Sequence, residues 1–412
     1  MMTTVNLSIT SIVLSIGVSY LVYFILGKIP KISSAMNNDG LGKYIYLDSI
    51  RGIAATLVFI HHSIMIYNFY YTGQYGPNGA FSYESQSIRN IYTYFGQASV
   101  MIFFMITGFL FFGKLLNADN NFNIKKFYES RIRRLVPAAL SGFVLLFIVA
   151  LLLTKKESSL PFLKLLIGWL SFGFISLPNI NNSIPGWVLN AGVFWTLAIE
   201  WKFYFLLPFM SYFIHGKKTA ISFLIGSFVL ITLLHKINQI DKHDVVVYSC
   251  FLFGLLAALI TRINSALLNI ILPKRITALA VIALLIIIFK KHDNAYNLSV
   301  AVAIFAFFLI VIFNNSIFGI LKSKTLSYAG KGSYSIYILH APILNLVCGI
   351  IIPGKSYYVS LVLSACLLGL ISFLNYVCVE RVFMKKNTLS SSEVEKKSNI
   401  SVQLSDVKSI KQ

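Results

Sequence analysis

Apolar residues occur in blocks of about 20, the length that an α-helix needs to cross roughly 30 Å of hydrocarbon. Because no water is available at that depth, each segment must satisfy its own backbone polar groups, as a helix does. Charged residues make up 12% of the 412 residues, against about 25% in soluble domains. The sequence therefore predicts an all-α fold, a polytopic bundle of transmembrane helices in a lipid bilayer.

Residues 160–177 are the one ambiguous apolar segment, because Lys164 interrupts them and an uncharged loop follows. If this segment is re-entrant, the loop lysines and arginines gather on one side of the membrane; if it crosses, they divide evenly. Positive loops stay in the cytoplasm, which favours the re-entrant version. We therefore expect about eleven crossings plus one re-entrant segment, with the N-terminus outside and the C-terminus inside. The expected crossings are about 6–27, 47–68, 91–113, 134–153, 193–214, 218–235, 246–260, 276–289, 297–320, 333–352 and 356–380.

The chain divides into three regions. Residues 1–43 are expected to form an additional N-terminal anchor helix and a cytoplasmic linker, and residues 44–384 the main membrane domain. Residues 385–412 are rich in Ser, Lys and Glu. This last region has too few apolar residues to fold alone, so we expect a disordered cytoplasmic tail.

The net charge of +21 raises the question of a nucleic-acid partner. The lysines and arginines lie in the short gaps between apolar blocks, however, which is the usual charge pattern of membrane proteins. We therefore expect no nucleic-acid partner. The four cysteines lie in or beside apolar blocks without a CxxC spacing, so neither a disulfide nor a metal site is expected.

Arg51 and His62 lie in one apolar span, where an ionisable residue costs a few kcal/mol and marks a functional candidate. Eleven residues at 100° each bring the two side chains to within about 20° of one helix face, about 16 Å apart along the axis. His61 lies about 80° from that face. Histidine suits proton transfer because its pKa is near neutral. The alternative is a pair of polar residues that are satisfied within the bundle.

Arg131, Arg133 and Arg134 precede Pro137, where the next span is expected to start. The charge distribution places them on the cytoplasmic side. Arginines three apart share a helix face and can hold phosphate oxygens bidentately. Anchoring at the membrane surface explains them equally well.

Glu200 and Tyr204 share a helix face in a later span, and His340 lies in the middle of another. A carboxylate in an apolar span needs a partner. Glu200 could orient an imidazole, pair with Arg51, or pair with Lys202 in a purely structural role. For His340, ligand contact and hydrogen bonding within the bundle both remain open.

Five motifs follow one another in a specific order. They are Leu47-Asp48-x-x-Arg51-Gly52-x-Ala54 with His62, Phe103-Phe104-x-x-Thr107-Gly108-Phe109-Leu110, Arg131-x-x-Arg134-x-x-Pro137, Trp195-x-Leu197-x-x-Glu200-x-x-Phe203-Tyr204, and Tyr334-Ser335-x-Tyr337-x-x-His340-x-Pro342. This order resembles the acyltransferase-3 family of bacterial membrane acyltransferases over roughly residues 44–383. The resemblance implies a ten-helix core that takes acyl groups from a coenzyme A thioester and modifies glycans or small molecules.

The resemblance also implies residue roles. Arg51 and His62 match the family's essential Arg–His pair, and Arg131 with Arg134 matches the RxxR motif thought to hold the coenzyme A phosphates. Glu200 matches the family's acidic residue. Thr107 and Thr196 stand where the family usually has serine, and both keep a hydroxyl. The expected site is therefore His62, Arg51 and Glu200 as catalytic residues, Arg131, Arg134 and Arg133 as donor-binding residues, and Tyr204, His340 and Trp195 as substrate-binding residues.

The expected function is O-acyl transfer, with acetyl as the expected group. Acetyl-CoA would be the donor, and a hydroxyl of an envelope glycan such as O-antigen, or of a lipid-linked oligosaccharide, the acceptor. The expected location is the bacterial inner (cytoplasmic) membrane, and no metal is expected. A transporter or flippase of an envelope precursor remains the alternative, with a glycan polymerase third. Absence of an inverted repeat counts against a transporter, and dependence on acetyl-CoA would separate the classes.

Overall fold

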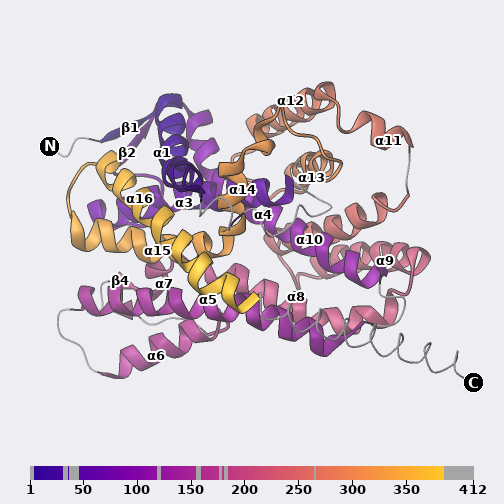
Figure 1. Cartoon of the computed structure of the whole chain (residues 1–412), viewed down its shortest axis with the longest axis horizontal. Coiled ribbons are helices and arrows are strands. Elements are labelled where there is room, and N and C mark those ends of the chain that lie inside the picture. The colour runs from indigo at the N-terminus through magenta and orange to yellow at the C-terminus, as the bar shows by residue number, and fades with distance from the viewer. Residues whose placement is uncertain are drawn as a thin grey trace, which may run out of the picture.

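The computed structural model describes residues 4–30, 36, 46–117, 122–154, 159–175, 179–180, 184–263 and 266–384. These residues are mostly helical, with two short two-stranded sheets (Figure 1). The α-helices are α1 (Ile9–Gly27), α3 (Tyr46–Thr72), α4 (Gln86–Asn117), α5 (Ile124–Leu153), α6 (Ser159–Leu170), α7 (Gly186–Leu189), α8 (Phe194–Phe213), α9 (Lys217–Lys236), α10 (Lys242–Ile260), α11 (Ala266–Ile271), α12 (Arg275–Lys291), α13 (Leu298–Ile312), α14 (Lys324–Lys331), α15 (Ser333–Leu346) and α16 (Tyr357–Asn375). The short helices are η1 (Ile320–Lys322), η2 (Val347–Ile351) and η3 (Tyr376–Glu380).

Each predicted crossing coincides with a helix, so the all-α polytopic class is confirmed. In the described part of the chain, eight helices are long and apolar enough to span a membrane. α8, α12 and α13 fall outside that group, and the number of crossings stays a prediction. The predicted span 297–320 is too long, because α13 ends at Ile312 and left-handed backbone at Asn314 and Ile317 prevents its continuation.

The ambiguous segment 160–177 contains α6, which has 12 residues and is therefore about 18 Å long, shorter than the hydrocarbon core. The chain then turns at Phe172 and Gly173, both with positive φ. A Cβ at Gly173 would lie 2.5 Å from the Phe194 carbonyl oxygen, so only glycine fits this approach to α8. A short helix followed by a tight turn is compatible with the predicted re-entrant segment.

The backbone of α7 is held by α15. The Asn345 Nδ2 donates to the carbonyls of Val188 and Leu189, both at 3.2 Å, and to Ala341 at 2.9 Å. Irregular backbone is tolerated at membrane depth only where protein groups satisfy it. A buried asparagine therefore fixes the segment between α6 and α8 against the centre of the bundle.

The centre of the bundle is formed by α3, α4, α10 and α15. α4 and α10 approach closely at two glycines. A Cβ at Gly108 would lie 2.3 Å from the Phe251 carbonyl oxygen, and a Cβ at Gly254 would lie 2.5 Å from that of Met105. Small residues at such crossings let two backbones pack directly, which is how helices associate in lipid.

The additional N-terminal helix α1 packs on α16 and α14. The Tyr23 hydroxyl bonds the Ser372 hydroxyl at 2.6 Å, and Ser11 bonds Tyr358 at 2.7 Å. Strand β1 (Val5–Leu7) pairs in parallel with β2 (Phe81–Tyr83), which joins this end of the chain to the segment between α3 and α4. A second sheet pairs β3 (Asn179–Ile180) with β4 (Ile184–Pro185). Most of the predicted linker and all of the predicted tail lie outside the described residues.

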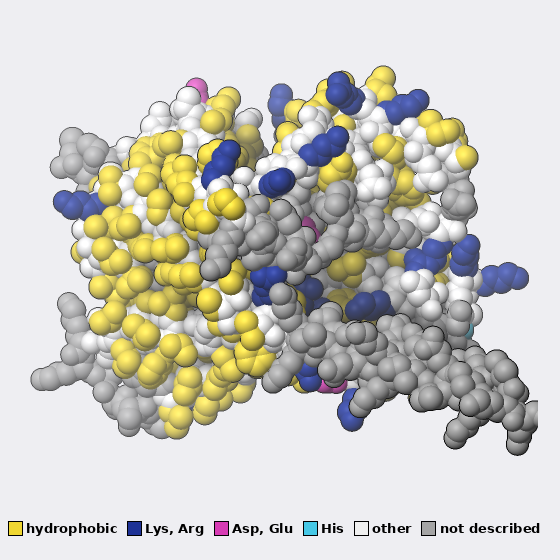
Figure 2. All heavy atoms as spheres, in the orientation of Figure 1, with side chains coloured by type: hydrophobic (Ala, Val, Ile, Leu, Met, Phe, Trp, Pro, Cys, Tyr) yellow, Lys and Arg dark blue, Asp and Glu magenta, His cyan; other side chains and the backbone are white. Residues whose placement is uncertain are grey.

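Apolar side chains cover much of the molecular surface. In Figure 2 they occupy most of the left half of the view, whereas Lys and Arg lie mainly toward the right. Exposed large residues on the outer helices include Phe209 and Tyr212 of α8 and Ile225 of α9. Such surfaces are unfavourable in water and suited to lipid, so the chain is a multi-pass membrane protein.

Candidate active site

Two cavities adjoin inside the bundle. The arginine cavity is bounded by Arg51, Thr107, Arg131, Arg134, Glu200 and Tyr204, and its volume is about 100 Å³. The histidine cavity is bounded by His61, His62, Gln97, Trp195, His243 and Tyr296, and its volume is about 420 Å³. Val100, Thr196 and Tyr337 line both. The two groups of ionisable residues therefore meet across a shared wall.

Arg131 and Arg134 reach the arginine cavity from α5. This helix begins at Ile124, so Pro137, the expected start of the membrane span, lies inside it, and the start of the span itself stays a prediction. The Arg131 guanidinium lies over the Phe111 ring at 4.8 Å. Its buried Nε has no hydrogen-bond partner among the described residues. The same is true of the buried hydroxyls of Ser333 and Tyr334, which line this cavity too.

Arg133 has a different environment. Its guanidinium forms an ion pair with Glu129 one turn earlier, and both side chains are partly exposed. It is not among the residues that line the arginine cavity. The structure therefore separates Arg133 from Arg131 and Arg134, because neighbouring helix positions point in different directions.

Glu200 accepts hydrogen bonds from two hydroxyls. Tyr204, one turn away, donates to its Oε1, and Thr107 of α4 donates to the same atom at 3.4 Å. The nearest acidic partner of Arg51 is Asp48, at 3.6 Å. Arg51 and Glu200 line the same cavity without a direct ion pair. These two hydroxyls satisfy the carboxylate, and neither belongs to the partners that the sequence had suggested for it.

Glu380 is a second acidic group on which these arginines act, and the sequence reasoning missed it. Its side chain is fully buried, and its Oε2 accepts from the Ser335 hydroxyl at 3.1 Å. Its Oε1 has no partner in the described structure. The charges of Arg51 and Arg134 both act on it. The available signal was an acidic residue at position 380, where the last predicted span ends.

His62 is held by a tyrosine from the segment after α3. Its Nδ1 lies 2.9 Å from the Tyr75 hydroxyl, and that hydroxyl donates to the Ala191 carbonyl at 3.4 Å. Burial raises the pKa of Tyr75, so the phenol keeps its proton at neutral pH. When Tyr75 donates to Ala191, its oxygen accepts the His62 Nδ1–H. The His62 Nε2 is then unprotonated and can act as a base.

His340 packs behind His62, with ring centroids 5.3 Å apart. Its Nδ1 lies 2.8 Å from the Tyr337 carbonyl, which can only accept, so this nitrogen carries the proton. Its Nε2 is buried without a hydrogen-bond partner in the described structure. His340 is not among the residues lining the histidine cavity. It therefore supports His62 from behind.

His61 also lines the histidine cavity, although the helical spacing separated it from Arg51 and His62. Its Nδ1 donates to the Tyr92 carbonyl of α4 at 2.8 Å. A Cβ at Gly96 would lie 2.5 Å from the His61 ring, so glycine at this position makes room for it. Contact with α4 thus brings both histidines to one cavity.

Trp195, at the start of α8, lines the histidine cavity together with two residues that the sequence reasoning missed. Its ring centroid lies 5.0 Å from that of His243, at the start of α10, and 6.4 Å from that of Tyr296, in the segment before α13. His243 and Tyr296 lie in polar segments between apolar blocks. Polar residues there need not be buried in lipid, so the sequence did not indicate them as functional candidates. Only their convergence in space identifies them.

Comparison with known proteins identifies the family of this chain. The model of the acyltransferase-3 family, an acyltransferase domain, matches residues 44–377. The chain is 25% identical over 338 residues to the O-acetyltransferases OatA of Staphylococcus aureus strains NCTC 8325 and COL, which covers 73% of this chain and 55% of each relative. An uncharacterized protein of Haemophilus influenzae is 29% identical over 128 residues, or 28% of this chain and 49% of that protein.

The chain thus spans about half the length of the curated relatives it matches. No solved structure matches it. The family model covers α3 through α16, the helices that carry both cavities. On that match, this chain belongs to the acyltransferase-3 family of membrane acyltransferases.

Proposed function

We propose that this protein is an O-acetyltransferase of the bacterial inner membrane that moves an acetyl group from acetyl-CoA to a hydroxyl of an envelope glycan. One observation carries the proposal: a cavity walled by arginines adjoins a cavity walled by histidines, and Val100, Thr196 and Tyr337 line both. An anionic donor suits the first cavity and a base for a hydroxyl acceptor suits the second. The similar staphylococcal proteins carry the name O-acetyltransferase, which supports acetyl as the group.

The arginine cavity supports the donor half. Arg131 and Arg134 present guanidinium groups, which match phosphate oxygens bidentately. Buried polar atoms are normally hydrogen-bonded, so the unpartnered Arg131 Nε, Ser333 Oγ and Tyr334 hydroxyl favour a polar ligand in this cavity. The phosphates and pantetheine amides of coenzyme A supply acceptors for all three. The lysine- and arginine-rich side of the bundle would face the cytoplasm, where coenzyme A thioesters are made.

The histidine cavity supports the acceptor half. In this mechanism the His62 Nε2 takes the proton from the acceptor hydroxyl while the oxygen of that hydroxyl bonds to the thioester carbonyl carbon. The bond to sulfur then breaks, the ester forms, and the proton passes from His62 to the leaving thiolate. Arg51, in the adjoining cavity, stabilises the negative charge that develops on the carbonyl oxygen. Tyr75 fixes the ring of His62 throughout.

The experiment compares envelope glycans by mass spectrometry from cells with the gene intact, deleted, or carrying His62→Ala at an equal membrane level. An acetyl-sized mass shift that requires both the gene and His62 is the expected result. Membranes from the same cells are then supplied with radiolabelled acetyl-CoA, and label in the glycan fraction is counted. Equal glycan acetylation in all three strains would overturn the proposal, and full activity of His62→Ala would remove His62 from the chemistry.

A further inference from the structure

Three aromatic rings from three separate elements form one wall of the histidine cavity. We call the group Trp195, His243 and Tyr296 the aromatic wall. The His243 and Tyr296 ring centroids lie 4.2 Å apart at 57°, and Trp195 lies against His243 at 5.0 Å and 60°. The Tyr296 segment is held in place because the Ala295 N–H donates to the Gln97 side chain at 2.7 Å. The wall is therefore a built surface of the cavity.

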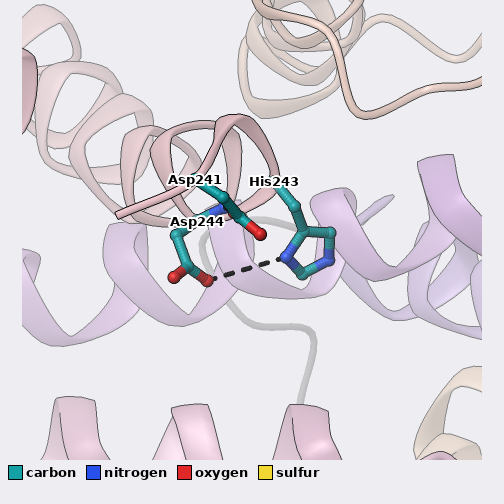
Figure 3. A group of neighbouring side chains, drawn as sticks. All are labelled: Asp241, His243 and Asp244. Atoms are coloured by element: carbon teal, nitrogen blue, oxygen red, sulfur yellow. Dashed lines mark hydrogen bonds and ion pairs between the residues drawn. The ribbon is translucent and has the colours of Figure 1, made fainter. Parts of the chain in front are cut away.

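The groups next to His243 are shown in Figure 3. The His243 Nδ1 lies 3.6 Å from the Asp244 carboxylate, and the Asp241 carboxylate caps α10 by accepting the Asp244 N–H at 2.8 Å. These three residues could hold a metal ion by distance alone. However, Asp241 already serves the helix start, and the positive end of the α10 dipole disfavours a cation there. The carboxylate of Asp244 is better explained as the group that orients the His243 ring.

The chemistry of the cavity indicates what it would bind. Aromatic faces bury the apolar C–H face of a flat ring, while cavity-lining imidazole and amide groups can hydrogen-bond hydroxyls at its rim. The volume of about 420 Å³ is within the range of small-ligand pockets, about 300–1,000 Å³. No lysine or arginine is among the described residues that line this cavity, and Asp244 adds negative charge beside His243. These features fit an uncharged ligand and disfavour an anionic one.

We propose that the aromatic wall binds an uncharged pyranose ring of the glycan acceptor and that His243 and Tyr296 determine its affinity. This inference rests on the proposed acyl transfer and specifies which surface selects the acceptor. A pyranose has the required combination of an apolar ring face and a hydroxyl rim. Stacking on the wall would place one of those hydroxyls in the cavity that holds His62. The wall takes no part in the bond changes.

The test uses the full chain in lipid nanodiscs and saturation-transfer NMR with methyl pyranosides of glucose, galactose, rhamnose and N-acetylglucosamine. Methyl glucuronoside serves as the anionic counterpart. At least one neutral glycoside is expected to bind through its ring C–H protons, more tightly than the glucuronoside. His243→Ala and Tyr296→Ala should each weaken that binding by about tenfold, the scale of one lost aromatic contact.

His235→Ala is the matched control, because His235 lies in the last turn of the neighbouring helix α9, bonds the Ile240 carbonyl and is not among the residues that line the cavity. It should change glycoside binding by no more than about twofold. Coenzyme A binding, measured by calorimetry on the same samples, should be unchanged in all three variants and reports that each is folded. Unaltered glycoside binding in His243→Ala and Tyr296→Ala would overturn the inference. Absence of binding to every neutral glycoside by the wild-type protein would overturn it as well.

The two proposals fail separately. Suppose that cells with the intact gene acetylate their glycan, and that His243→Ala and Tyr296→Ala bind glycosides and acetylate the glycan normally. Acyl transfer then stands, and the aromatic wall is excluded as the acceptor surface. If the gene makes no difference to glycan acetylation, acyl transfer to a glycan fails whatever the nanodisc result. The expected pattern in cells is reduced glycan acetylation in His243→Ala with normal coenzyme A affinity.

Discussion

The hydroxyl groups of Thr196 and Tyr337 lie 2.5 Å apart, at the position where the arginine cavity and the histidine cavity adjoin. Thr196 also donates to the Val193 carbonyl at 2.8 Å, so it accepts from Tyr337. This pair joins α8 to α15 and forms part of the wall between the two cavities. In the proposed reaction the acyl group moves past this pair, from the donor in the arginine cavity to the acceptor in the histidine cavity. We expect the pair to keep water away from the thioester.

Thr196→Val removes the hydrogen bond at nearly constant volume. We expect hydrolysis of acetyl-CoA without acceptor to rise by about 2- to 10-fold, the equivalent of one hydrogen bond, because water reaches the thioester more easily. Release of free thiol from purified protein measures this rate. The control is Thr232→Val on α9, whose hydroxyl bonds the Phe228 carbonyl of its own helix. Equal hydrolysis by both variants would contradict the role of the pair.

Arg134 and Arg133 are adjacent in sequence but differ in environment, since only Arg134 lines the arginine cavity. Arg134→Ala should raise the dissociation constant of coenzyme A by about 10- to 100-fold, as expected for lost charged hydrogen bonds. Arg133→Ala should change it by no more than about twofold, because this side chain pairs with Glu129. Calorimetric titration with coenzyme A measures both. Similar losses in the two variants would indicate general charge attraction instead of a defined phosphate site.

Tyr75→Phe removes the hydroxyl that holds the His62 Nδ1. We expect kcat for acetyl transfer to fall about tenfold, because the imidazole loses the partner that orients it. KM for acetyl-CoA should stay the same, since the donor occupies the other cavity. Tyr71→Phe is the control, as Tyr71 stacks on Tyr67 at 5.7 Å and does not line the histidine cavity. A raised KM with unchanged kcat would place Tyr75 in donor binding instead.

Glu380→Gln removes a buried negative charge and keeps an oxygen that can accept from Ser335. Because Glu380 partly neutralises Arg51 and Arg134, the variant should bind coenzyme A several-fold more tightly. The ligand-free variant should also melt at a lower temperature, since its guanidinium groups repel one another more strongly. Glu129→Gln, which alters the partly exposed partner of Arg133, should affect neither measurement. Weaker coenzyme A binding in Glu380→Gln would show that this carboxylate orients the arginines more than it neutralises them.

Gly108→Ala places a methyl group 2.3 Å from the Phe251 carbonyl oxygen, so α4 and α10 must separate. Overpacking of this kind costs about 1–3 kcal/mol, and Tm of the purified protein should fall accordingly. Gly226→Ala on α9 is the matched control, because a Cβ there meets nothing within 4 Å. Alanine should stabilise that helix by about 0.5–1 kcal/mol. A fall in Tm of the same size in both variants would show that the α4–α10 crossing tolerates separation.

Much of the architecture could be predicted from the sequence because lipid imposes strict rules. Apolar blocks of about 20 residues have few alternatives to helices, so each predicted crossing coincides with a helix. The same rule makes ionisable residues in those blocks conspicuous, which is why Arg51, His62 and Glu200 could be named in advance. The Arg131–Arg134 spacing likewise placed both side chains on one helix face.

Contacts between helices could not be predicted in this way. A helical repeat gives the face on which a residue lies but not the neighbour that this face meets. His61 therefore looked separate from His62, although α4 brings both to one cavity, and His340 packs behind His62 from almost 280 positions later in the chain. His243 and Tyr296 carried no signal of their own, because they lie in polar segments where burial is not costly.

The sequence alone determined that the chain is a helical membrane protein, which family it resembles, and which charged residues are too costly to be accidental. Only the tertiary structure decided that Arg134 lines the arginine cavity and Arg133 does not, that Glu380 is buried where the charges of Arg51 and Arg134 act on it, and that two cavities adjoin at Thr196 and Tyr337. The reason is that burial in lipid acts on each segment separately, whereas a cavity is formed by side chains from segments that are far apart in the chain.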